Sequence, residues 1–318
     1  MAGRAGALPA RAAAPAARPR PLWREIWRKR MLYLALTPTF ALLSVFEYYP
    51  PLSAMYHAFF QWTGASDPKF VGLANFAELA TDKVFWPSVA NMLRVLVVHL
   101  AFQLTVPFLV AELLFHLRIE RLSYLFRLLF VVPLVVPWIV SLLIWQFIYD
   151  PSVGLLNAIL GAIGLDWLRG GWLGDPSRAL WAYTFIGFPF AYPVYVLILL
   201  AGLQGITDSV HEAALMDGAR GLRKMLSIDL PLVTGQLKLI LILTVIQNVQ
   251  LYGSVLVLTR GGPGYATMLP GLHMYLNAFE FSRMGYASAI GFVMFLVILG
   301  LTYVNMRYVK SSTEYEAT

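Results

Sequence analysis

The sequence of 318 residues is 59% hydrophobic and only 13% charged. A soluble globular domain is about 45–50% apolar and about 25% charged, so this composition excludes that class and indicates a chain that crosses a membrane several times. The complete absence of cysteine excludes disulfides, thiolate metal ligands and cysteine nucleophiles. The net charge of +7 does not indicate nucleic acid, because most Lys and Arg residues lie in short segments beside apolar runs.

Residues 1–30 form a basic tract rich in Ala, Arg and Pro, which predicts a disordered tail because the tract has little apolar surface to bury. Six apolar spans follow, and each is long enough to cross a bilayer as a helix. The sequence therefore predicts an all-α membrane domain over 31–307, with its core at 88–307, and a short tail at 308–318. The spans are placed at 31–51, 88–115, 123–149, 180–203, 235–259 and 285–307.

The distribution of basic residues predicts the orientation of the chain. Most of the 24 Lys and Arg residues lie in the N-terminal tail, near Arg118, near Arg220 and in the C-terminal tail. Basic residues beside membrane spans stay preferentially in the cytoplasm. Both termini and the loop around Arg220 are therefore predicted to be cytoplasmic, which agrees with an even number of spans.

Prolines interrupt two of the predicted spans. Pro133 and Pro137 lie in the third span, and Pro189 and Pro193 lie in the fourth. Each removes a backbone donor and bends or opens a helix, which is tolerated at membrane depth where other helices or a water-filled cavity satisfy the freed groups. These positions favour a helix bundle with a pathway, although each proline can also serve only to shape packing.

Three amide side chains, Gln247, Asn248 and Gln250, stand close together in the fifth span. Amides are costly in hydrocarbon unless they pair across helices or face water, and a row of amides and aromatic rings suits a neutral polyhydroxyl ligand. The alternative is that these groups join helices and form an interfacial aromatic belt. The candidate substrate pathway consists of Trp145, Gln146, Tyr192, Tyr195, Gln247, Asn248, Gln250 and Tyr252.

Reactive and ion-binding patterns are missing from the sequence. No span has a central Asp or Glu, which argues against an ion-coupled carrier; His99 is interpreted as a packed, hydrogen-bonded side chain, and Glu112 as a group near a helix end that reaches water. There is no phosphate-binding loop and no other catalytic motif. We therefore predict no catalytic residue, no metal and no cofactor on this chain.

A polar segment at 204–234 separates the fourth and fifth spans. Ser209 and Glu212 have the spacing of a capping box, so a short helix is predicted to begin near Asp208 or Ser209, and Gly218 is predicted to end it in a left-handed conformation. A second short helix would carry Leu222, Met225 and Leu226. The alternative is a connector that rests on lipid headgroups through its basic residues, which are Arg220, Arg223 and Lys224.

This segment resembles the coupling loop of bacterial ABC importer permeases, through Glu212-Ala213-Ala214, Gly218, Ile228 and Leu230-Pro231. The form Glu212 to Ala219, together with the stretches Gly154 to Asn157 and Leu258 to Pro263, resembles the carbohydrate-uptake branch, of the maltose and glycerol-phosphate type. The similarity covers about residues 31–307. One departure is Thr207, where the family often has proline, and we expect it to alter how the helix starts.

The resemblance implies a type I ABC importer permease in the bacterial inner (plasma) membrane, without an ATPase site of its own, that moves a sugar, an oligosaccharide or a sugar derivative. It implies four kinds of partner: a second permease subunit, usually in a heterodimer, an ATPase dimer that binds ATP and Mg, an extracytoplasmic binding protein and the sugar. An ion-coupled secondary carrier or channel for a small polar solute is the alternative. The residues that the resemblance implies dock on the ATPase are Glu212, Ala213, Ala214, Leu215, Met216, Asp217, Gly218, Ile228, Leu230 and Pro231.

Overall fold

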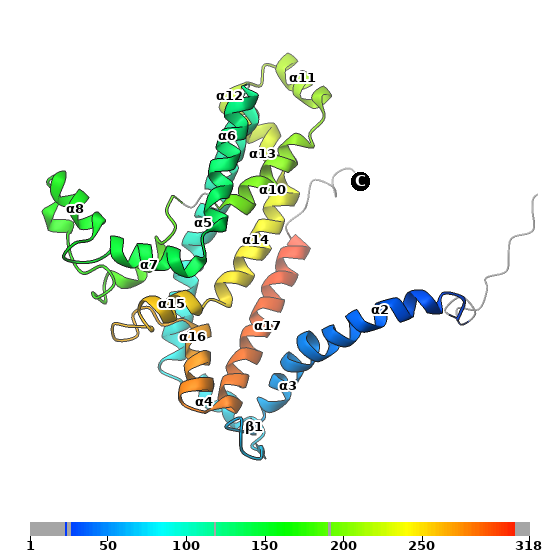
Figure 1. The fold of residues 1–318 in the computed structure, drawn as a ribbon, viewed down its shortest axis with the longest axis vertical. Coiled ribbons are helices and arrows are strands. Elements are labelled where there is room, and N and C mark those ends of the chain that lie inside the picture. The colour runs from blue at the N-terminus through cyan, green and yellow to red at the C-terminus, as the bar shows by residue number, and fades with distance from the viewer. Residues whose placement is uncertain (1–22, 24–26, 118, 190–191, 309–318) are drawn as a thin grey trace, which may run out of the picture. The chain divides into compact units, whose positions relative to one another are not determined.

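The computed structural model describes residue 23 and residues 27–117, 119–189 and 192–308, and most of these residues are helical (Figure 1). These residues divide into two compact units, 1–53 and 54–318. The predicted tail at 308–318 lies outside the described residues except for Tyr308, as does the predicted N-terminal tail up to residue 26 except for Trp23.

The first unit is helical from Arg30 onward. It contains α2 (Arg30–Leu43) and a π-helical stretch, η1 (Ser44–Tyr48), and α3 (Tyr49–His57) crosses its boundary. Together, residues 30–57 form a helix of 28 residues that is long and apolar enough to cross a membrane. No residue of α2 or α3 is buried, so their apolar side chains require lipid or another protein chain as their surroundings.

The second unit begins with a two-stranded antiparallel sheet, in which Phe60 of β1 (Phe60–Gln61) pairs with Phe70 of β2 (Lys69–Phe70). A short helix, α4 (Ala74–Ala80), then leads to α5 (Phe85–His116). At 32 residues, α5 is long and apolar enough to cross a membrane unaided.

Asp82 fixes the start of α5. Its carboxylate accepts hydrogen bonds from the amides of Val84 at 2.7 Å and Phe85 at 3.0 Å, from His273 Nε2 at 2.9 Å, and from the Tyr286 hydroxyl. Burial alone would raise the pKa of Asp82, but these hydrogen bonds, that of Tyr286 foremost, outweigh burial and hold the pKa well below its ordinary value. The carboxylate therefore ties the start of α5 to two later helices.

Three of the predicted spans are not single continuous helices in the structure. The span predicted at 123–149 is divided into α6 (Glu120–Val131) with a 3₁₀ turn, η2 (Val132–Val135), and α7 (Trp138–Ile148), with a bend of 93° between the two parts. Pro137 stands at this bend with an extended backbone, ψ 132°. It cannot donate a helical hydrogen bond, so the predicted effect of the prolines is confirmed here.

The span predicted at 180–203 is divided into α9 (Ala179–Thr184) and α10 (Pro193–Gln204), with turns after α9. Pro193 occupies the first turn of α10, where its missing N–H costs nothing. The span predicted at 235–259 is divided into α14 (Thr234–Val249) and α15 (Gly253–Leu258). Here Gly271 packs against the break, because a Cβ at Gly271 would lie only 2.8 Å from the Leu251 carbonyl oxygen.

The remaining elements lie in the connections and at the C-terminal side. They are α8 (Leu155–Ala162), η3 (Asp166–Leu168), α11 (Asp208–Met216), α12 (Gly221–Lys224), η4 (Met225–Asp229), α13 (Leu230–Leu232), α16 (Pro270–Tyr275), η5 (Leu276–Glu280) and α17 (Met284–Tyr308). The helix α17 covers the residues predicted as the last span, and it is long and apolar enough to cross a membrane.

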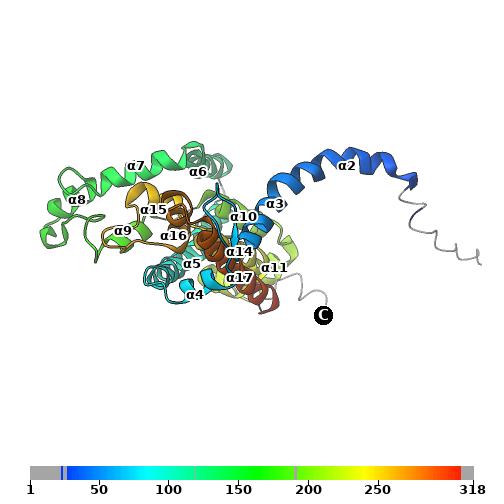
Figure 2. The ribbon, with the colours of Figure 1, turned by 90° about the horizontal axis from the view of Figure 1, so that it is seen from below.

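Two clusters of buried apolar side chains hold the second unit together. One includes Val95 of α5, Leu272 of α16 and Ile290 of α17. The other joins α5, α10 and α14 and includes Leu199 and Ile240. Accordingly, α5, α14 and α17 lie side by side, while α8 lies away from them beyond the end of α7 (Figure 2).

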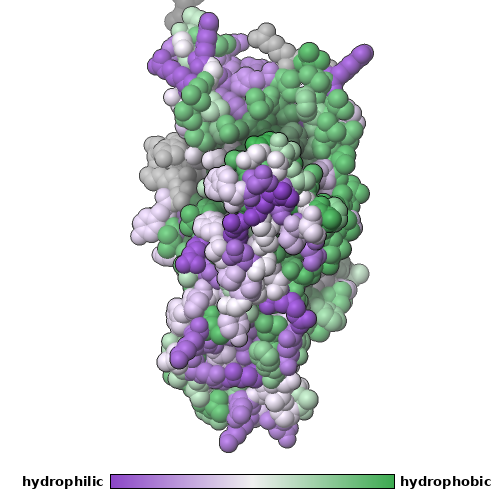
Figure 3. Space-filling model, turned by 90° about the vertical axis from the view of Figure 1, so that its left-hand side faces the viewer, coloured by the Kyte–Doolittle hydropathy of each residue, from purple (hydrophilic) through white to green (hydrophobic). Residues whose placement is uncertain are grey.

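The surface of the second unit alternates between apolar and polar zones. On the side that carries α8, hydrophilic residues gather in the middle of the face and at its two ends, with hydrophobic residues between and beside them (Figure 3). Many large apolar side chains along the long helices are exposed, among them Val97 and Leu113 of α5 and Leu299 of α17. Exposed apolar surface of this extent is suited to lipid and not to water.

Candidate functional site

The helix α11 begins at Asp208, as predicted, but not through the predicted capping box. Its N-cap is Thr207, with extended backbone (ψ 147°), and no side chain caps the first turn. The Thr207 hydroxyl lies 3.0 Å from that of Ser209 instead. Since Ser209 is already inside the helix, the pair Ser209 and Glu212 lies two residues too late to form a capping box, and that prediction is wrong.

The C-terminal end of α11 forms as predicted. Gly218 adopts the left-handed conformation with φ +74°. The amide of Ala219 donates to the Ala214 carbonyl at 2.9 Å, and the amide of Gly218 donates to the Leu215 carbonyl at 3.1 Å. These two hydrogen bonds form a Schellman motif, which stops the helix and turns the chain toward α12.

The two sides of α11 differ in exposure. Ala214 is only 2% exposed and packs inward, whereas Leu215 is 50% and Met216 88% exposed. Glu212, Ala213, Asp217 and Gly218 are also exposed. A short helix therefore presents two apolar side chains flanked by carboxylates, next to small residues that allow another backbone to approach closely. We call the exposed residues Glu212, Ala213, Leu215, Met216 and Asp217 the coupling surface.

The second half of the segment faces inward more than the first. Residues 221–232 form a helix of three parts, bent by 70° relative to α14. Ile228 is half-buried and Leu230 packs on the cluster of α5, α10 and α14, while Pro231 is exposed. Ile228 and Leu230 thus anchor the segment in the helix bundle and do not belong to the coupling surface.

The structure contradicts, for Lys224, the alternative in which the basic residues of this segment contact lipid headgroups. The Lys224 side chain is 8% exposed, and Nζ donates to both carboxylate oxygens of Asp229 at 2.8 Å. Arg220 and Arg223 remain exposed. Asp229, which is 0% exposed, was not predicted, because residues five apart do not meet on a regular α-helix and the pair forms across a π-helical stretch.

In the pathway region, Asn248 is a packing group. It is 3% exposed, its Nδ2 donates to the Thr244 carbonyl at 2.8 Å, and its Oδ1 lies 2.7 Å from His99 Nδ1. The other ring nitrogen of His99 lies 3.2 Å from the Thr184 carbonyl oxygen. The interpretation of His99 as a packed, hydrogen-bonded side chain is confirmed, and the pair joins α5, α9 and α14.

Gln247 and two predicted tyrosines come together. The Tyr195 hydroxyl donates to Gln247 Oε1 at 3.3 Å, and the rings of Tyr192 and Tyr195 lie 5.7 Å apart. Gln247 is exposed, so it keeps hydrogen-bonding capacity toward the surroundings. One turn from Gln247, the buried hydroxyl of Thr244 donates to Gln103 Oε1 at 2.7 Å. The sequence analysis missed Gln103, although it stands four residues after His99 on the same helix face.

The other predicted pathway residues form separate groups. Tyr252 stacks on Tyr275 with 5.4 Å between the rings, and Gln250 is exposed beside it at the end of α14. Trp145 packs on Tyr149 with 5.4 Å between the rings, and Gln146 is exposed on α7. Only Tyr192, Tyr195 and Gln247 are joined directly to one another by the contacts above.

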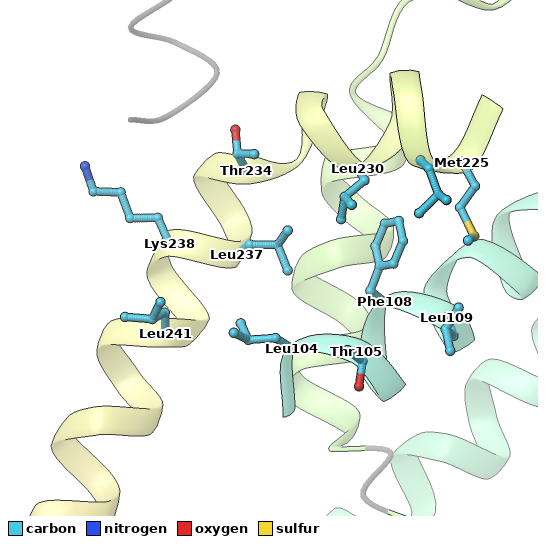
Figure 4. A pocket seen from close by; sticks show the side chains of 11 residues that line it. Leu104, Thr105, Phe108, Leu109, Met225, Leu230, Thr234, Leu237, Lys238 and Leu241 are labelled. Atoms are coloured by element: carbon cyan, nitrogen blue, oxygen red, sulfur yellow. The ribbon is translucent and has the colours of Figure 1, made fainter. Parts of the chain in front are cut away.

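An apolar cavity of about 350 Å³ lies between α5, α14 and the helix at 221–232. Leu104, Phe108, Leu230 and Leu237 point toward one another around it, while the ammonium of Lys238 points away (Figure 4). The lining is mostly leucine, and its two threonine hydroxyls, of Thr105 and Thr234, already donate to backbone carbonyls, so it offers few hydrogen-bonding partners to a hydroxyl-rich ligand. The cavity is therefore not a site for a polar substrate.

The helical fold, the broken membrane helices and the exposed coupling surface define a class, that of multi-pass membrane transport proteins. No protein-family profile matches the chain. The chain is 32% identical over 283 residues to the probable ABC transporter permease protein YurN of Bacillus subtilis, covering 89% of this chain and 97% of that protein. It is also 32% identical to the trehalose/maltose transport system permease protein MalF of Thermococcus litoralis, covering 86% and 92%.

These similarities span nearly the whole sequence. The chain belongs to the family of ABC transporter permease proteins, which confirms the resemblance found in Glu212 to Pro231. Among solved structures, a bacterial ABC transporter involved in the import of the acidic polysaccharide alginate matches with a TM-score of 0.78, covering 91% of this chain and 99% of that one. At 22% identity, this match establishes the fold.

Proposed function

We propose that this chain is the permease subunit of an ATP-driven importer for a sugar, an oligosaccharide or a sugar derivative. The trehalose/maltose permease of Thermococcus litoralis supports the substrate class, since it resembles this chain over most of both lengths. The alginate importer, whose complex with a binding protein is also known, shares the fold. The single observation that carries the proposal is the coupling surface of α11, a shaped and exposed patch on an otherwise lipid-adapted chain.

The coupling surface suits a separate ATPase. The sequence has no phosphate-binding loop, so ATP and Mg would be bound by a partner, and no ATPase site would lie on this chain. We infer that Leu215 and Met216 fill an apolar cleft of the ATPase while Glu212 meets a basic residue at its rim. Gly218 shapes this surface by ending α11, whereas Ala214, Ile228, Leu230 and Pro231 support it from the side of the bundle.

The helix lengths support six spans. Among the described residues, three helices are long enough to cross a membrane alone, and three bent pairs pass the same test, which allows up to six spans. Two of these pairs include α11 or the helix at 221–232, so we infer that the fourth and fifth spans consist instead of α9 with α10 and of α14 with α15. With the distribution of Lys and Arg, we infer that both termini and α11 are cytoplasmic, and that the chain consists of a tail at 1–30, a permease domain at 31–307 with its core at 88–307 and coupling loop at 204–234, and a tail at 308–318. The membrane would be the bacterial inner membrane.

The transport step would be a rigid-body movement of this chain together with a second permease subunit, and the two subunits would form a heterodimer as is usual in the family. Closure of the ATPases on ATP would draw the coupling helices together and switch the pathway from inward-open to outward-open, where a binding protein delivers the sugar. We infer that Tyr192, Gln247 and Gln250 contact the sugar, because rings and amides offer stacking faces and hydrogen bonds, and that the buried Tyr195 orients Gln247 through its hydroxyl. Asn248 holds the helices in register instead.

Co-purification tests this function. Glu212→Arg reverses a charge on the coupling surface and should lower the amount of ATPase that co-purifies with the chain at least about tenfold, as expected for a mispaired interface charge. Asp67→Arg, at an exposed position of the loop between β1 and β2, is the matched control and should have no effect. If the chain alone in liposomes moved solute down an ion gradient and bound no ATPase, it would be a secondary carrier or channel and the proposal would fail.

A further inference from the structure

A buried cluster of charges lies beside the coupling segment. Lys224 and Asp229 form an ion pair in which Nζ bonds to both carboxylate oxygens at 2.8 Å, and both side chains are almost completely buried. The chain between them is π-helical over Met225–Asp229. A π-helical turn interrupts the regular hydrogen bonding of a helix and is often found at functional positions.

The end of α5 contributes two more polar groups to the cluster. Atoms of Glu112, His116 and Asp229 that can act as ligands lie within 4.8 Å of one another. Glu112 is 7% exposed, so the prediction that it reaches water is wrong, and its Oε2 has no hydrogen-bond partner among the described residues. His116 Nδ1 lies 3.7 Å from Glu112 Oε1. Of these two buried carboxylates, that of Asp229 bonds to the Lys224 ammonium, and that of Glu112 lies beside Asp229.

Ring contacts extend the cluster to α11. The Lys224 ammonium lies 5.9 Å from the centre of the Phe115 ring, within the range of a cation–π contact. The Phe115 ring lies 5.5 Å from the ring of His211, which belongs to α11. The helix that carries the coupling surface is therefore connected to α5 through Phe115 and the charged cluster.

The same helix α5 carries polar groups of the pathway region. Gln103 bonds to Thr244 and His99 bonds to Asn248, and both partners stand on α14. Since α5 is one continuous helix from Phe85 to His116, a displacement of its end at Glu112 moves these groups as well. A rigid element in contact with both sites is what coupling between them requires.

We propose that Glu112, Lys224 and Asp229 form a charge clamp that fixes the coupling segment to the end of α5, so that movement of α11 reaches Gln103 and His99. The clamp rests on the proposed function, because it has a role only if an ATPase moves α11. The ammonium of Lys224 lies against Phe115 of α5, and Glu112 lies beside its partner Asp229, so sliding of the segment along α5 would take this buried charge away from both groups. Glu112, Lys224 and Asp229 act here as positioning residues.

A metal ion is the competing occupant of these carboxylates. Lys224 already donates to both oxygens of Asp229, and an ammonium in this place repels a divalent cation. The clamp therefore needs no ion. If Zn²⁺ or Mn²⁺ raised the melting temperature of the purified chain and Glu112→Leu removed that effect, the cluster would be a metal site and the clamp would be refuted.

The experiment measures whether ATP bound to the partner ATPase changes the accessibility of a residue at the end of α14. The chain has no cysteine, so Gln250→Cys introduces a single reactive group at the exposed end of α14. In the full complex with ATPase and second permease, Mg-ATP should change the rate of maleimide labelling of this cysteine at least about fivefold, a size typical of coupling between sites. Adding Glu112→Leu, which keeps the Lys224 and Asp229 pair intact, should remove most of this change while the ATPase still co-purifies.

The controls separate the clamp from stability and from the proposed function. Leu113→Ala, at an exposed neighbouring position on α5, should leave the ATP effect unchanged. If Glu112→Leu does not fold, the pair Lys224→Met and Asp229→Leu, which removes both partners together, carries the same test. An unchanged ATP effect in folded clamp variants overturns the clamp, as does a wild-type complex that shows no ATP effect. Failure of wild-type chain to bind any ATPase refutes the proposed function instead.

Discussion

The coupling surface of α11 and the amide group of α14 differ in how their polar and apolar side chains are used. On α11, Met216 is 88% exposed and Glu212 is exposed, and neither is needed to hold the bundle together. On α14, Asn248 is 3% exposed and bonded to His99. Side chains that bind another molecule stay exposed, whereas a side chain that a sequence pattern predicts to be functional can instead be buried and hydrogen-bonded between helices.

The largest effect is expected from Gly218→Val. At φ +74° the substitution strains the backbone at the end of α11, at a cost of about 1–2 kcal/mol, while open space around the Cβ excludes a clash. We expect uptake into proteoliposomes to fall at least about tenfold, because the coupling surface is misplaced by a disrupted helix end.

Gly164 offers a matched control for this substitution. It lies in the connection after α8 with φ +76° and equally open space. Gly164→Val should therefore cost a similar amount of stability and leave uptake close to wild type. Equal loss of uptake in both variants would mean that backbone strain alone explains the result, and that α11 has no special role.

Asn248→Ala and Gln250→Ala test the packing side of the comparison. Removing Asn248 leaves His99 Nδ1 without its partner, so the free energy of unfolding in detergent should fall by about 1–3 kcal/mol. Gln250→Ala should leave stability unchanged and alter the concentration of sugar at half-maximal uptake. The opposite pattern, with a stable Asn248→Ala and an unstable Gln250→Ala, would exchange the roles of the two amides.

The pH dependence of stability tests the other end of α5. The pKa of Asp82 is held low in the folded chain, so its carboxylate contributes stability that is complete above the ordinary Asp pKa of about 4 and is lost as pH falls through the lowered value. Asp82→Asn should reduce thermal stability at pH 7, by about 1–3 kcal/mol for a charged hydrogen-bonding group. This difference should shrink in thermal unfolding scans below pH 4. A constant difference would show that the charge is not the cause.

The smallest effect is expected from Thr207→Pro. Thr207 has φ −69°, which proline also adopts, and it stands directly before the first residue of α11. The substitution should change the free energy of unfolding by no more than about 1 kcal/mol, toward higher stability, and leave uptake intact. A large loss of uptake would show that the Thr207 hydroxyl contributes to the coupling surface.

Sequence reasoning succeeded where short-range chemistry decides the structure. The start of α11 at Asp208, its end at Gly218 and the bend at Pro137 each depend on a few neighbouring residues. The capping box failed because the N-cap is Thr207 and not Ser209, and this difference of two residues changes which pairs meet. Similarly, the span predicted at 235–259 breaks where α16 packs against Leu251, which no local pattern reveals.

The buried charges show more clearly what cannot be predicted from the sequence. Lys224 looked like a surface cation, and Glu112 looked like a group that reaches water at a helix end. Their burial depends on the approach of two segments more than a hundred residues apart, α5 and the helix at 221–232. Hydropathy identifies charged residues near membrane ends but does not tell which of them pair.

Cysteine labelling of the coupling surface tests the central claim most directly. Met216→Cys, in membrane vesicles of known orientation, should react with an impermeant maleimide from the cytoplasmic side only, and bound ATPase should protect it. Trp167→Cys, 74% exposed in η3, should react from the opposite side whether or not the ATPase is present. Labelling of Met216→Cys from the outer side, or labelling that the ATPase does not reduce, would contradict the assignment of α11 as the docking helix.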